Sequence, residues 1–326
     1  MLFGITIGDS SGIGPEIVLK SFKESKIHHP AIVYGDFDVL DYYNRLLDLR
    51  VPLLKIDAPV LQDPGALNVL DHQLMHSGDI TPGKLNEKSG FAAREYVISA
   101  ARAALAGDIA AMVTLPMNKE STQLSDPNFV GHTELIGAVC GVKDVTIMLA
   151  SDDLIVTHVS THVSLATAIA RTKKDRICTI IRLTNDAVQK LKTQPRIAVA
   201  GLNPHAGENG LFGDEEINEI RPAVEWAQSE GMPVEGPFPP DTLFYMAVRK
   251  KKYDAIVCMY HDQGHVPLKL LDFEGGVNVA LGLPIIRTSV DHGTAFDIAG
   301  KGVASTTSLL RALDFAVKLA QQRTAA

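Results

Sequence analysis

The sequence predicts an α/β fold with largely parallel strands, arranged as two lobes with a cleft between them. Short apolar, β-branched runs alternate with longer helical patterns, which is typical of βαβ units. The 326 residues, 46% of them hydrophobic, suffice for one large core or two medium ones, and typical domain sizes favour two. Several strand-like runs are followed by polar segments rich in histidine and glycine, as expected where ligand loops gather beyond the carboxyl ends of strands.

Five apolar runs predict buried strands, and five longer patterns predict helices. The predicted strands are Ala31–Tyr34, Ile109–Thr114, Leu154–His158, Arg196–Ala200 and Asp254–Met259. The predicted helices are Pro15–Lys26, Glu87–Ala106, Lys173–Lys192, Asp214–Ser229 and Ser305–Gln321. No repeat of fixed period and no low-complexity linker separates them, so we expect the lobes to be joined by strands that cross between them.

Charge and hydropathy exclude two classes of partner. The formal net charge is -7 and no block of like charges is present, which argues against a protein that binds nucleic-acid phosphates. The basic run at 249–252 is expected to be a solvated helix end. No stretch approaches ~18 uncharged apolar residues, and the chain enters a strand-like pattern without a basic leader and apolar signal core. We therefore expect a cytoplasmic protein with no membrane partner.

The three cysteines are expected to be ordinary packing residues. Cys140, Cys178 and Cys258 are widely spaced and lie in apolar surroundings. They form neither a disulfide framework nor a CxxC metal or redox motif.

The N-terminal segment 3–16 predicts a strand, a glycine loop and the start of a helix. Pro15 suits the first helical turn. The glycines Gly8, Gly12 and Gly14 do not fit the G-x-G-x-x-G fingerprint, and no acidic residue closes a second strand about 20 residues on. A tight strand-to-helix turn explains these glycines without a dinucleotide.

Three histidines follow strand-like runs and are candidate metal ligands. His162, His205 and His261 each lie at or near the carboxyl end of such a run, and these ends can converge. Neutral imidazole is a common ligand of zinc and similar ions, and a three-histidine site leaves coordination positions open for substrate. Separations of 43 and 56 residues carry no local metal signature, so three unrelated loop histidines are the alternative.

A second group of residues is a candidate anion site. His132 and Thr133 follow a glycine turn before a predicted helix, and the amides and dipole of a helix N-terminus hold phosphate or carboxylate groups. The alternative is a threonine cap with an incidental histidine. Lys269, Asn278 and Arg287 can complete the pocket, although lone basic residues usually face solvent.

The segment 289–302 predicts a loop that binds a flat ligand. Small residues, among them Gly293 and Ala295, surround a polar turn and let backbone approach such a ligand closely. The carboxylate of Asp297 can accept hydrogen bonds from ribose hydroxyls while repelling a 2′-phosphate.

The chain resembles the 4-hydroxythreonine-4-phosphate dehydrogenase family of vitamin B6 synthesis over nearly its whole length. Five motifs in the family's order carry the resemblance. They are Gly-Ile-Gly-Pro-Glu at 12–16, Gly-His-Thr-Glu at 131–134, Asn-Pro-His-Ala-Gly-Glu at 203–208, Tyr-His-Asp-Gln-Gly at 260–264, and Arg-Thr-Ser-Val-Asp-His-Gly-Thr-Ala at 287–295.

The resemblance implies an isocitrate/isopropylmalate dehydrogenase-like fold and a homodimer whose active site lies between lobes and borrows residues across the interface. Residues 1–125 with 268–326 would form the NAD-binding lobe, and 126–267 the lobe for metal, substrate and dimerisation. One metal ligand is expected from the partner subunit. Carried over by motif, the metal ligands are His162, His205 and His261, and the substrate contacts are His132, Thr133, Lys269, Asn278 and Arg287.

The resemblance also implies the cofactors and the reaction. The loop residues Gly293, Thr294 and Ala295 match an adenosine-binding motif of related decarboxylating dehydrogenases, in which Asp297-Ile298 resembles the NAD version and Lys-Tyr the NADP version. A divalent ion, either zinc or magnesium, cobalt or manganese, would lower the pKa of the substrate hydroxyl so that hydride leaves for the nicotinamide, and the 3-keto acid would then lose carbon dioxide. Candidates for proton transfer are Lys269, Asp241 and Asp262, without a ranking.

Two departures from the family pattern bear on the substrate. Ser10-Ser11 replaces the usual Pro-Ala, and His265 stands where the vitamin B6 enzymes tend to have an aliphatic residue. The main interpretation is oxidation of 4-phosphooxy-L-threonine. Residues 264–271 look more like a branch acting on D-threonate or D-erythronate 4-phosphate, and partly like dihydrodiol dehydrogenases of aromatic catabolism, although the retained anion residues favour a phosphorylated substrate.

Two other classes of protein remain as alternatives. A phosphate acyltransferase has a related two-lobed architecture and needs an anion pocket, but it would not need three metal histidines. A metal- or phosphate-binding regulator without turnover would leave the loop at 291–302 without a role.

Overall fold

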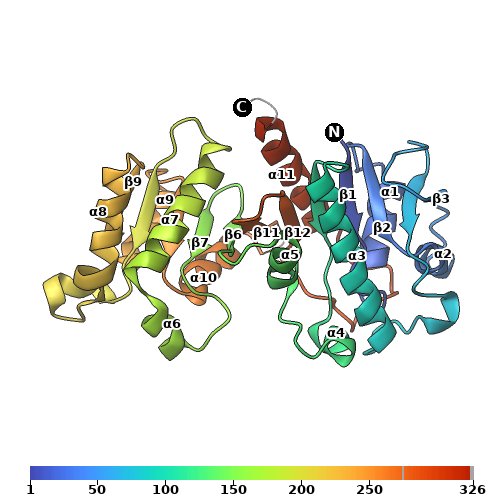
Figure 1. The fold of residues 1–326 in the computed structure, drawn as a ribbon, viewed down its shortest axis with the longest axis horizontal. Coiled ribbons are helices and arrows are strands. Elements are labelled where there is room, and N and C mark those ends of the chain that lie inside the picture. Colours follow the sequence, from blue (N-terminus) through green and yellow to red (C-terminus); the bar gives the residue numbers. More distant parts are fainter. Residues whose placement is uncertain (274, 324–326) are drawn as a thin grey trace. The chain divides into compact units, whose positions relative to one another are not determined.

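The structure, a computed structural model, describes residues 1–273 and 275–323 and forms two compact units. Met1–Val145 with Leu283–Gln321 form the first, and Thr146–Gly282 form most of the second; they are called unit 1 and unit 2 (Figure 1). Among the described residues, no helix has the length and apolarity needed to cross a membrane.

Unit 1 contains a parallel sheet with the strand order β3-β4-β2-β1-β5-β12. The strands are β1 (Phe3–Thr6), β2 (Ala31–Gly35), β3 (Leu53–Ile56), β4 (Leu67–Asp71), β5 (Ala111–Thr114) and β12 (Arg287–Val290). Ile5 of the central strand is opposite Val33 and Val113 and is fully buried. Near-continuous apolar runs such as these are what a sheet buried on both faces requires.

The helices of unit 1 complete its core. They are α1 (Gly14–Lys23), α2 (Phe37–Leu46), α3 (Glu87–Ala106), α4 (Lys119–Ser125), α5 (His132–Cys140) and α11 (Thr307–Arg323). Helix α3 begins after Asn86, whose side chain accepts from the Ser89 amide, and ends at Gly107 in the left-handed conformation. It packs against β1, β2 and β5. Helix α11 is tied to β12 by Thr288, whose hydroxyl donates to the Ala312 carbonyl at 2.8 Å.

Unit 2 contains a mixed sheet with the strand order β11-β6-β7-β10-β8-β9. The strands are β6 (Thr146–Ala150), β7 (Ile155–His158), β8 (Ile197–Ala200), β9 (Val234–Phe238), β10 (Ala255–Cys258) and β11 (Val277–Leu281). β7, β10, β8 and β9 run parallel, whereas β6 is antiparallel to both β7 and β11. The carboxyl ends of β7, β10 and β8 therefore lie at one edge of the sheet.

Two layers of helices cover this sheet. The helices are α6 (Leu165–Arg171), α7 (Lys174–Gln189), α8 (Arg221–Ser229), α9 (Pro240–Val248) and α10 (His261–Leu271). Val199 and Val257 belong to a core cluster with residues of α7 and α8, while Ala198 and Ile256 belong to one with residues of α9 and α10. Successive strand residues thus face opposite layers, as the two-residue period of a strand dictates.

The predicted α/β fold and its ten predicted elements are present, with changes mainly at their ends. Helix α3 has the predicted bounds. The predicted helix 214–229 is divided into a π-helical turn at Glu216–Ile220 and α8. Pro222 lies at the start of α8 and has no amide hydrogen to donate, which accounts for the break in the helical hydrogen bonds.

The boundaries of the units differ from the predicted lobes, which were 1–125 with 268–326 and 126–267. Residues 126–145 belong to unit 1 because α5 packs against α3. Residues 268–282 belong to unit 2 because β11 pairs with β6. Unit 1 is made of two separate stretches of the chain.

Candidate active site

Four histidines gather at the carboxyl edge of the unit 2 sheet. His158 ends β7, His162 follows it, and His261 and His265 lie in the first turns of α10, which follows β10. The His162 and His261 ring centroids are 5.5 Å apart, and His261 stacks on His265 with centroids 3.6 Å apart. Nδ1 of His265 lies 3.2 Å from Nε2 of His158. Two of the three predicted metal ligands are thus brought together.

Two of these four histidines, the buried His158 and His265, are uncharged. Burial, and then the neighbouring His265 and His261, lower the pKa of His158 to about 3. Burial and then His261 lower the pKa of His265 to about 4. Neutral imidazole is the form that supports a metal ligand or accepts a proton.

Helix α10 presents His261, His265 and Lys269 at four-residue intervals, which places them on one face. The charge of Lys269 acts on His265, and its ammonium group lies 5.5 Å from the centre of the Phe273 ring. The absence of a side chain at Gly264 permits the close packing beneath: a Cβ there would meet His158 Nε2 at 2.5 Å. The glycine of the motif at 260–264 is therefore a packing requirement.

Asp262 orients the His261 ring. Its Oδ1 lies 2.6 Å from His261 Nδ1. Because a carboxylate can only accept, Nδ1 donates the hydrogen bond and Nε2 is left to bind a metal or substrate. Asp262, predicted as a candidate for proton transfer, thus has a positioning contact with a predicted ligand.

Gln263 connects two histidine-bearing segments. Its Oε1 accepts from the Met259 amide at 2.7 Å, and its Nε2 donates to the Gly201 carbonyl at 2.7 Å. Met259 precedes α10, and Gly201 precedes the turn that carries His205. The buried amide therefore joins the ends of β10 and β8.

His205 lies in a left-handed turn. The φ angles of five consecutive residues, 205–209, are positive, and only Gly207 among them is a glycine. Each non-glycine residue in this conformation costs roughly 1–2 kcal/mol. The His205 side chain is exposed beside Phe212, with ring centroids 6.1 Å apart. Strain of this kind is characteristic of functional segments.

The metal triad is present only in part within one chain. His162 and His261 form a pair with the nitrogen chemistry that zinc and related ions prefer. In the ranges 1–273 and 275–323, no three His, Cys, Asp or Glu side chains are placed to hold a metal together. The donor set therefore fits a metal only if a further ligand is added.

The other predicted residues of unit 2 lie on different elements. Asp241 is exposed in the first turn of α9, which packs against the His205 turn. Asn278 is half-buried on β11, opposite Leu149 of β6. Lys269 is half-buried on α10.

In unit 1, His132 and Arg287 form a polar site at the start of α5. The buried guanidinium of Arg287 donates to Thr114 Oγ1 from Nε at 3.1 Å and from Nη2 at 2.8 Å. Burial and then the Arg287 charge lower the pKa of His132 to about 3, and burial lowers the pKa of Arg287 to about 10 despite the Glu134 charge. Thr133 is the second residue of α5 and is half-buried.

This site has the donors that an anion requires. Nε2 of His132 is buried without a hydrogen-bond partner among the described residues. A desolvated guanidinium, a neutral imidazole and a helix N-terminus together favour a phosphate group. The structure thus brings His132 and Arg287 together, while Lys269 and Asn278 belong to unit 2.

The loop 291–302 lies against the N-terminal glycine loop. The Ile13 amide donates to the Thr294 carbonyl at 3.1 Å, and Glu16 accepts from the amides of Gly302 at 3.1 Å and Ala304 at 2.7 Å. The glycine loop is therefore a tight turn that supports this loop. Ala295 has a φ of 44°, and Asp297 and Gly293 are exposed. A Cβ at Gly293 would meet no atom within 4 Å, so the backbone there is open to a ligand.

Sequence reasoning missed several residues that hold the site. Asp9 is buried and accepts hydrogen bonds from the Ser11 amide and the Ser89 hydroxyl, and burial raises its pKa. Glu16 and Gln263 were quoted only within motifs, and Glu216 only within a helix. For Asp9, Glu16 and Gln263, the available signal is a polar residue inside a glycine-rich motif; Glu216 has no such signal.

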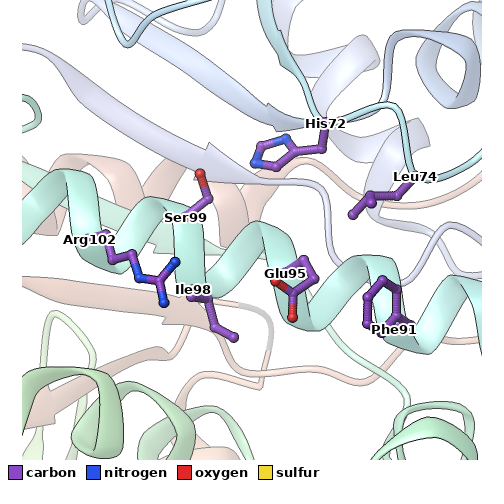
Figure 2. A pocket seen from close by; sticks show the side chains of 7 residues that line it. All are labelled: His72, Leu74, Phe91, Glu95, Ile98, Ser99 and Arg102. Atoms are coloured by element: carbon purple, nitrogen blue, oxygen red, sulfur yellow. The ribbon is translucent and has the colours of Figure 1, made fainter.

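A hollow of about 340 Å³ in unit 1 contains none of the predicted site residues. Figure 2 shows Glu95, Ser99 and Arg102 projecting from α3, with His72 across from them. The lining is completed by Leu74, Phe91 and Ile98.

Comparison with known proteins gives a consistent result. The family model described as pyridoxal phosphate biosynthetic protein PdxA matches residues 26–316. The chain is 42% identical to the D-threonate 4-phosphate dehydrogenase of Pectobacterium atrosepticum, over 98% of this chain and 99% of the relative. It is also 42% identical to the 4-hydroxythreonine-4-phosphate dehydrogenase of Trichlorobacter lovleyi, over 98% of this chain and 97% of the relative.

A solved structure agrees with these relatives. The crystal structure of 4-hydroxythreonine-4-phosphate dehydrogenase from Klebsiella pneumoniae superposes with a TM-score of 0.90, at 42% identity, covering 98% of this chain and 99% of that one.

Proposed function

The chain belongs to the PdxA family and is a dehydrogenase that oxidises a CH–OH group, and from this we propose that it uses NAD and one divalent metal ion to oxidise a four-carbon acid phosphorylated at C4. The observation that carries the proposal is the pairing of His162 with His261 at the carboxyl edge of the unit 2 sheet, with ring centroids 5.5 Å apart. Two imidazoles held this closely, one exposed and one half-buried, are suited to share one ion.

His162, His205 and His261 would hold the metal, with one of them supplied by the partner subunit. When bound, the ion would supply Lewis-acid polarisation of the substrate hydroxyl. Asp262 keeps Nε2 of His261 available by accepting from Nδ1. His265 supports the opposite face of the same ring by stacking.

The phosphate is held by His132, Thr133 and Arg287, with Lys269 and Asn278 as further contacts. Support comes from the buried guanidinium of Arg287 and the unpartnered Nε2 of His132. His132 can donate from Nε2 to the phosphate in the tautomer that carries its proton there, while Arg287 supplies the charge.

The nicotinamide cofactor is NAD and is bound by the loop with Gly293, Thr294, Ala295, Asp297 and Ile298. The exposed carboxylate of Asp297 suits ribose hydroxyls and repels a 2′-phosphate. When bound, the nicotinamide would supply the acceptor for the hydride from C3.

The reaction has two steps. In the first, hydride leaves C3 while the hydroxyl proton goes to a base. In the second, the C1–C2 bond of the 3-keto acid breaks and carbon dioxide leaves. The electrons of that bond pass to the C3 oxygen, and a proton is then added at C2. Lys269, Asp241 and Asp262 are the candidates for these transfers. Lys269 shares one face of α10 with His261, which favours it over Asp241 on α9.

Two substrates fit, and they differ only at C2. D-threonate 4-phosphate carries a hydroxyl there, and 4-phosphooxy-L-threonine carries an amine. His265 favours the first, because an imidazole stacked on His261 takes the place of an aliphatic side chain. The retained phosphate residues keep the second as a candidate in pyridoxine synthesis, with D-erythronate 4-phosphate as a variant of the first.

The protein functions as a homodimer in the cytoplasm. Helix α10, which carries His261 and Lys269, also exposes Val266 by 60% and Leu270 by 86%. Large exposed side chains on a site-bearing helix favour a protein interface there. Leu270→Glu is expected to yield monomers with little activity by sedimentation and assay, whereas Leu46→Glu in unit 1 should leave dimers; a dimeric Leu270→Glu would remove this support.

The substrate panel is the test of the function. Purified protein with NAD and Zn²⁺, Co²⁺, Mn²⁺ or Mg²⁺ is assayed for NADH at 340 nm with the three 4-phosphorylated acids and with their unphosphorylated forms. We expect oxidation of D-threonate 4-phosphate and release of carbon dioxide, with little reaction of the unphosphorylated acids. No NADH with any acid and metal would refute the proposal.

A further inference from the structure

The turn that presents His205 is held in an unfavourable conformation. The φ angles of His205, Ala206, Glu208 and Asn209 are 55°, 52°, 44° and 56°. Right-handed or extended backbone is the default for L-residues, so contacts outside these residues must hold the turn. The hydrogen bond from the Ala206 amide to the Asn203 carbonyl, 3.1 Å long, lies at its start.

Those contacts converge on the buried carboxylate of Glu216, which is 1% exposed. Its Oε1 accepts from the amides of Leu202 and Asn203, each at 2.7 Å, and its Oε2 accepts from Nδ2 of Asn203 at 2.9 Å. Bonds to an ionised acceptor are stronger than neutral ones. Three such bonds fix the segment that enters the turn.

The turn is shaped around this carboxylate. A Cβ at Gly207 would lie 2.8 Å from Oε2 of Glu216, and a Cβ at Gly201 would lie 3.1 Å from Oε1 and 3.0 Å from the Ala206 Cα. Glycines therefore stand on both sides of His205 where the carboxylate must fit. Glu216 itself begins a π-helical turn, a feature that is frequent at functional sites.

We propose that Glu216 is the positioning residue for His205: its carboxylate holds the left-handed turn and thereby fixes the direction in which the imidazole projects. The effect on metal binding rests on the proposed function, whereas the stabilisation of the turn by Glu216 does not depend on it. Residues that orient a ligand typically change metal affinity 10–100-fold when lost, so an effect of about that size is expected.

The matched control is Glu219, which lies on the same helical turn. It accepts from Nζ and from the amide of neighbouring residues Lys173 and Lys174, each at 2.8 Å, and it does not contact the His205 turn in these bonds. Glu219→Gln removes the same charge as Glu216→Gln while leaving the turn in place.

Two measurements separate the parts of the proposal. Amide hydrogen exchange of the purified protein without added metal is expected to accelerate over residues 202–213 in Glu216→Gln and to stay unchanged in Glu219→Gln. Co²⁺ affinity, measured by chelator competition, is expected to fall about 10–100-fold in Glu216→Gln. Adding His205→Ala to Glu216→Gln should give no further loss beyond His205→Ala alone, because both act through the same ligand.

Unchanged exchange over 202–213 in Glu216→Gln, or additive losses in the double variant, would overturn the proposal. If His205→Ala binds Co²⁺ like the wild type, the proposed ligand set fails, and the exchange experiment still decides the role of Glu216. If Glu216→Gln does not fold, Asn203→Leu removes the donor to Glu216 Oε2, together with its bond to Glu215 Oε2, and must accelerate exchange in the same segment. Ala206→Gly, which relieves the strain, should restore Co²⁺ affinity to Glu216→Gln.

Discussion

Nε2 of Gln263 donates to the Gly201 carbonyl at 2.7 Å and so ties the start of α10 to the end of β8. The same side chain accepts from the Met259 amide. Gln263→Leu leaves both buried backbone groups unpaired and is expected to destabilise the protein by about 2–4 kcal/mol. Urea unfolding checks this, with the exposed Gln189→Leu as the control. A loss no greater than that of the control would show that the bridge is dispensable.

Gly264→Ala is expected to displace α10 from β7. The added Cβ would meet His158 Nε2 at 2.5 Å and Cys258 Sγ at 3.0 Å. Overpacking of this kind costs about 1–3 kcal/mol. The midpoint temperature of thermal unfolding and the Co²⁺ affinity should both fall. Gly78→Ala, whose Cβ would meet nothing within 4 Å, should change neither. Wild-type behaviour of Gly264→Ala would contradict the packing argument.

Asp297→Ser is expected to weaken the preference for NAD over NADP, because it removes the charge that repels a 2′-phosphate. The ratio of kcat/KM for the two cofactors is the measurement. Asp314→Ser, which changes an exposed carboxylate on α11, is the control. A ratio that does not move would place the adenosine elsewhere.

Gly293→Ala should weaken NAD binding without lowering stability, since a Cβ there meets no protein atom.

His132 is expected to make the fold acid-sensitive. Its pKa is about 3 when folded against 6.5 for an ordinary histidine, so between these values the unfolded chain binds more protons and stability falls as the pH falls. His132→Gln should reduce the slope of unfolding free energy against pH by up to about 1.4 kcal/mol per pH unit. Urea unfolding from about pH 7 to 4 measures this slope. Equal slopes would mean that His132 titrates normally.

The same lowered pKa predicts how substrate binding depends on pH. His132 remains neutral above about pH 5 because its pKa lies near 3, so its protonation does not change KM in that range. A change in KM that disappears in His132→Gln would contradict this.

The regular elements could be predicted because burial leaves a period in the sequence. Helix α3 is an example, since Asn86 and Gly107 mark its two ends. Helix α10 was not predicted: Gly264 and Pro267 lie inside it, and its first residues are polar. Polar residues of α10 are buried by packing among histidines, so the helix lacks the apolar periodicity from which helices are predicted.

The candidate site could be predicted in its residue types more readily than in its arrangement. Strand order brings His162 and His261 together, and the parallel sheet was predicted. The left-handed conformation at Ala206 and Glu208 could not be predicted, because nothing in the sequence distinguishes these residues from ordinary turn residues. The role of Glu216 depends on that conformation and therefore became visible only with the structure.

The division of unit 1 has a consequence for synthesis. A ribosome completes Thr146–Gly282 before it adds Leu283–Gln321, which contains β12 and α11. Until then β5 is paired only with β1, and its other edge is open, a risk for pairing with another chain. Unit 2 can therefore fold while unit 1 waits for the last segment, and a chain truncated after residue 282 should resist protease in unit 2 more than in unit 1.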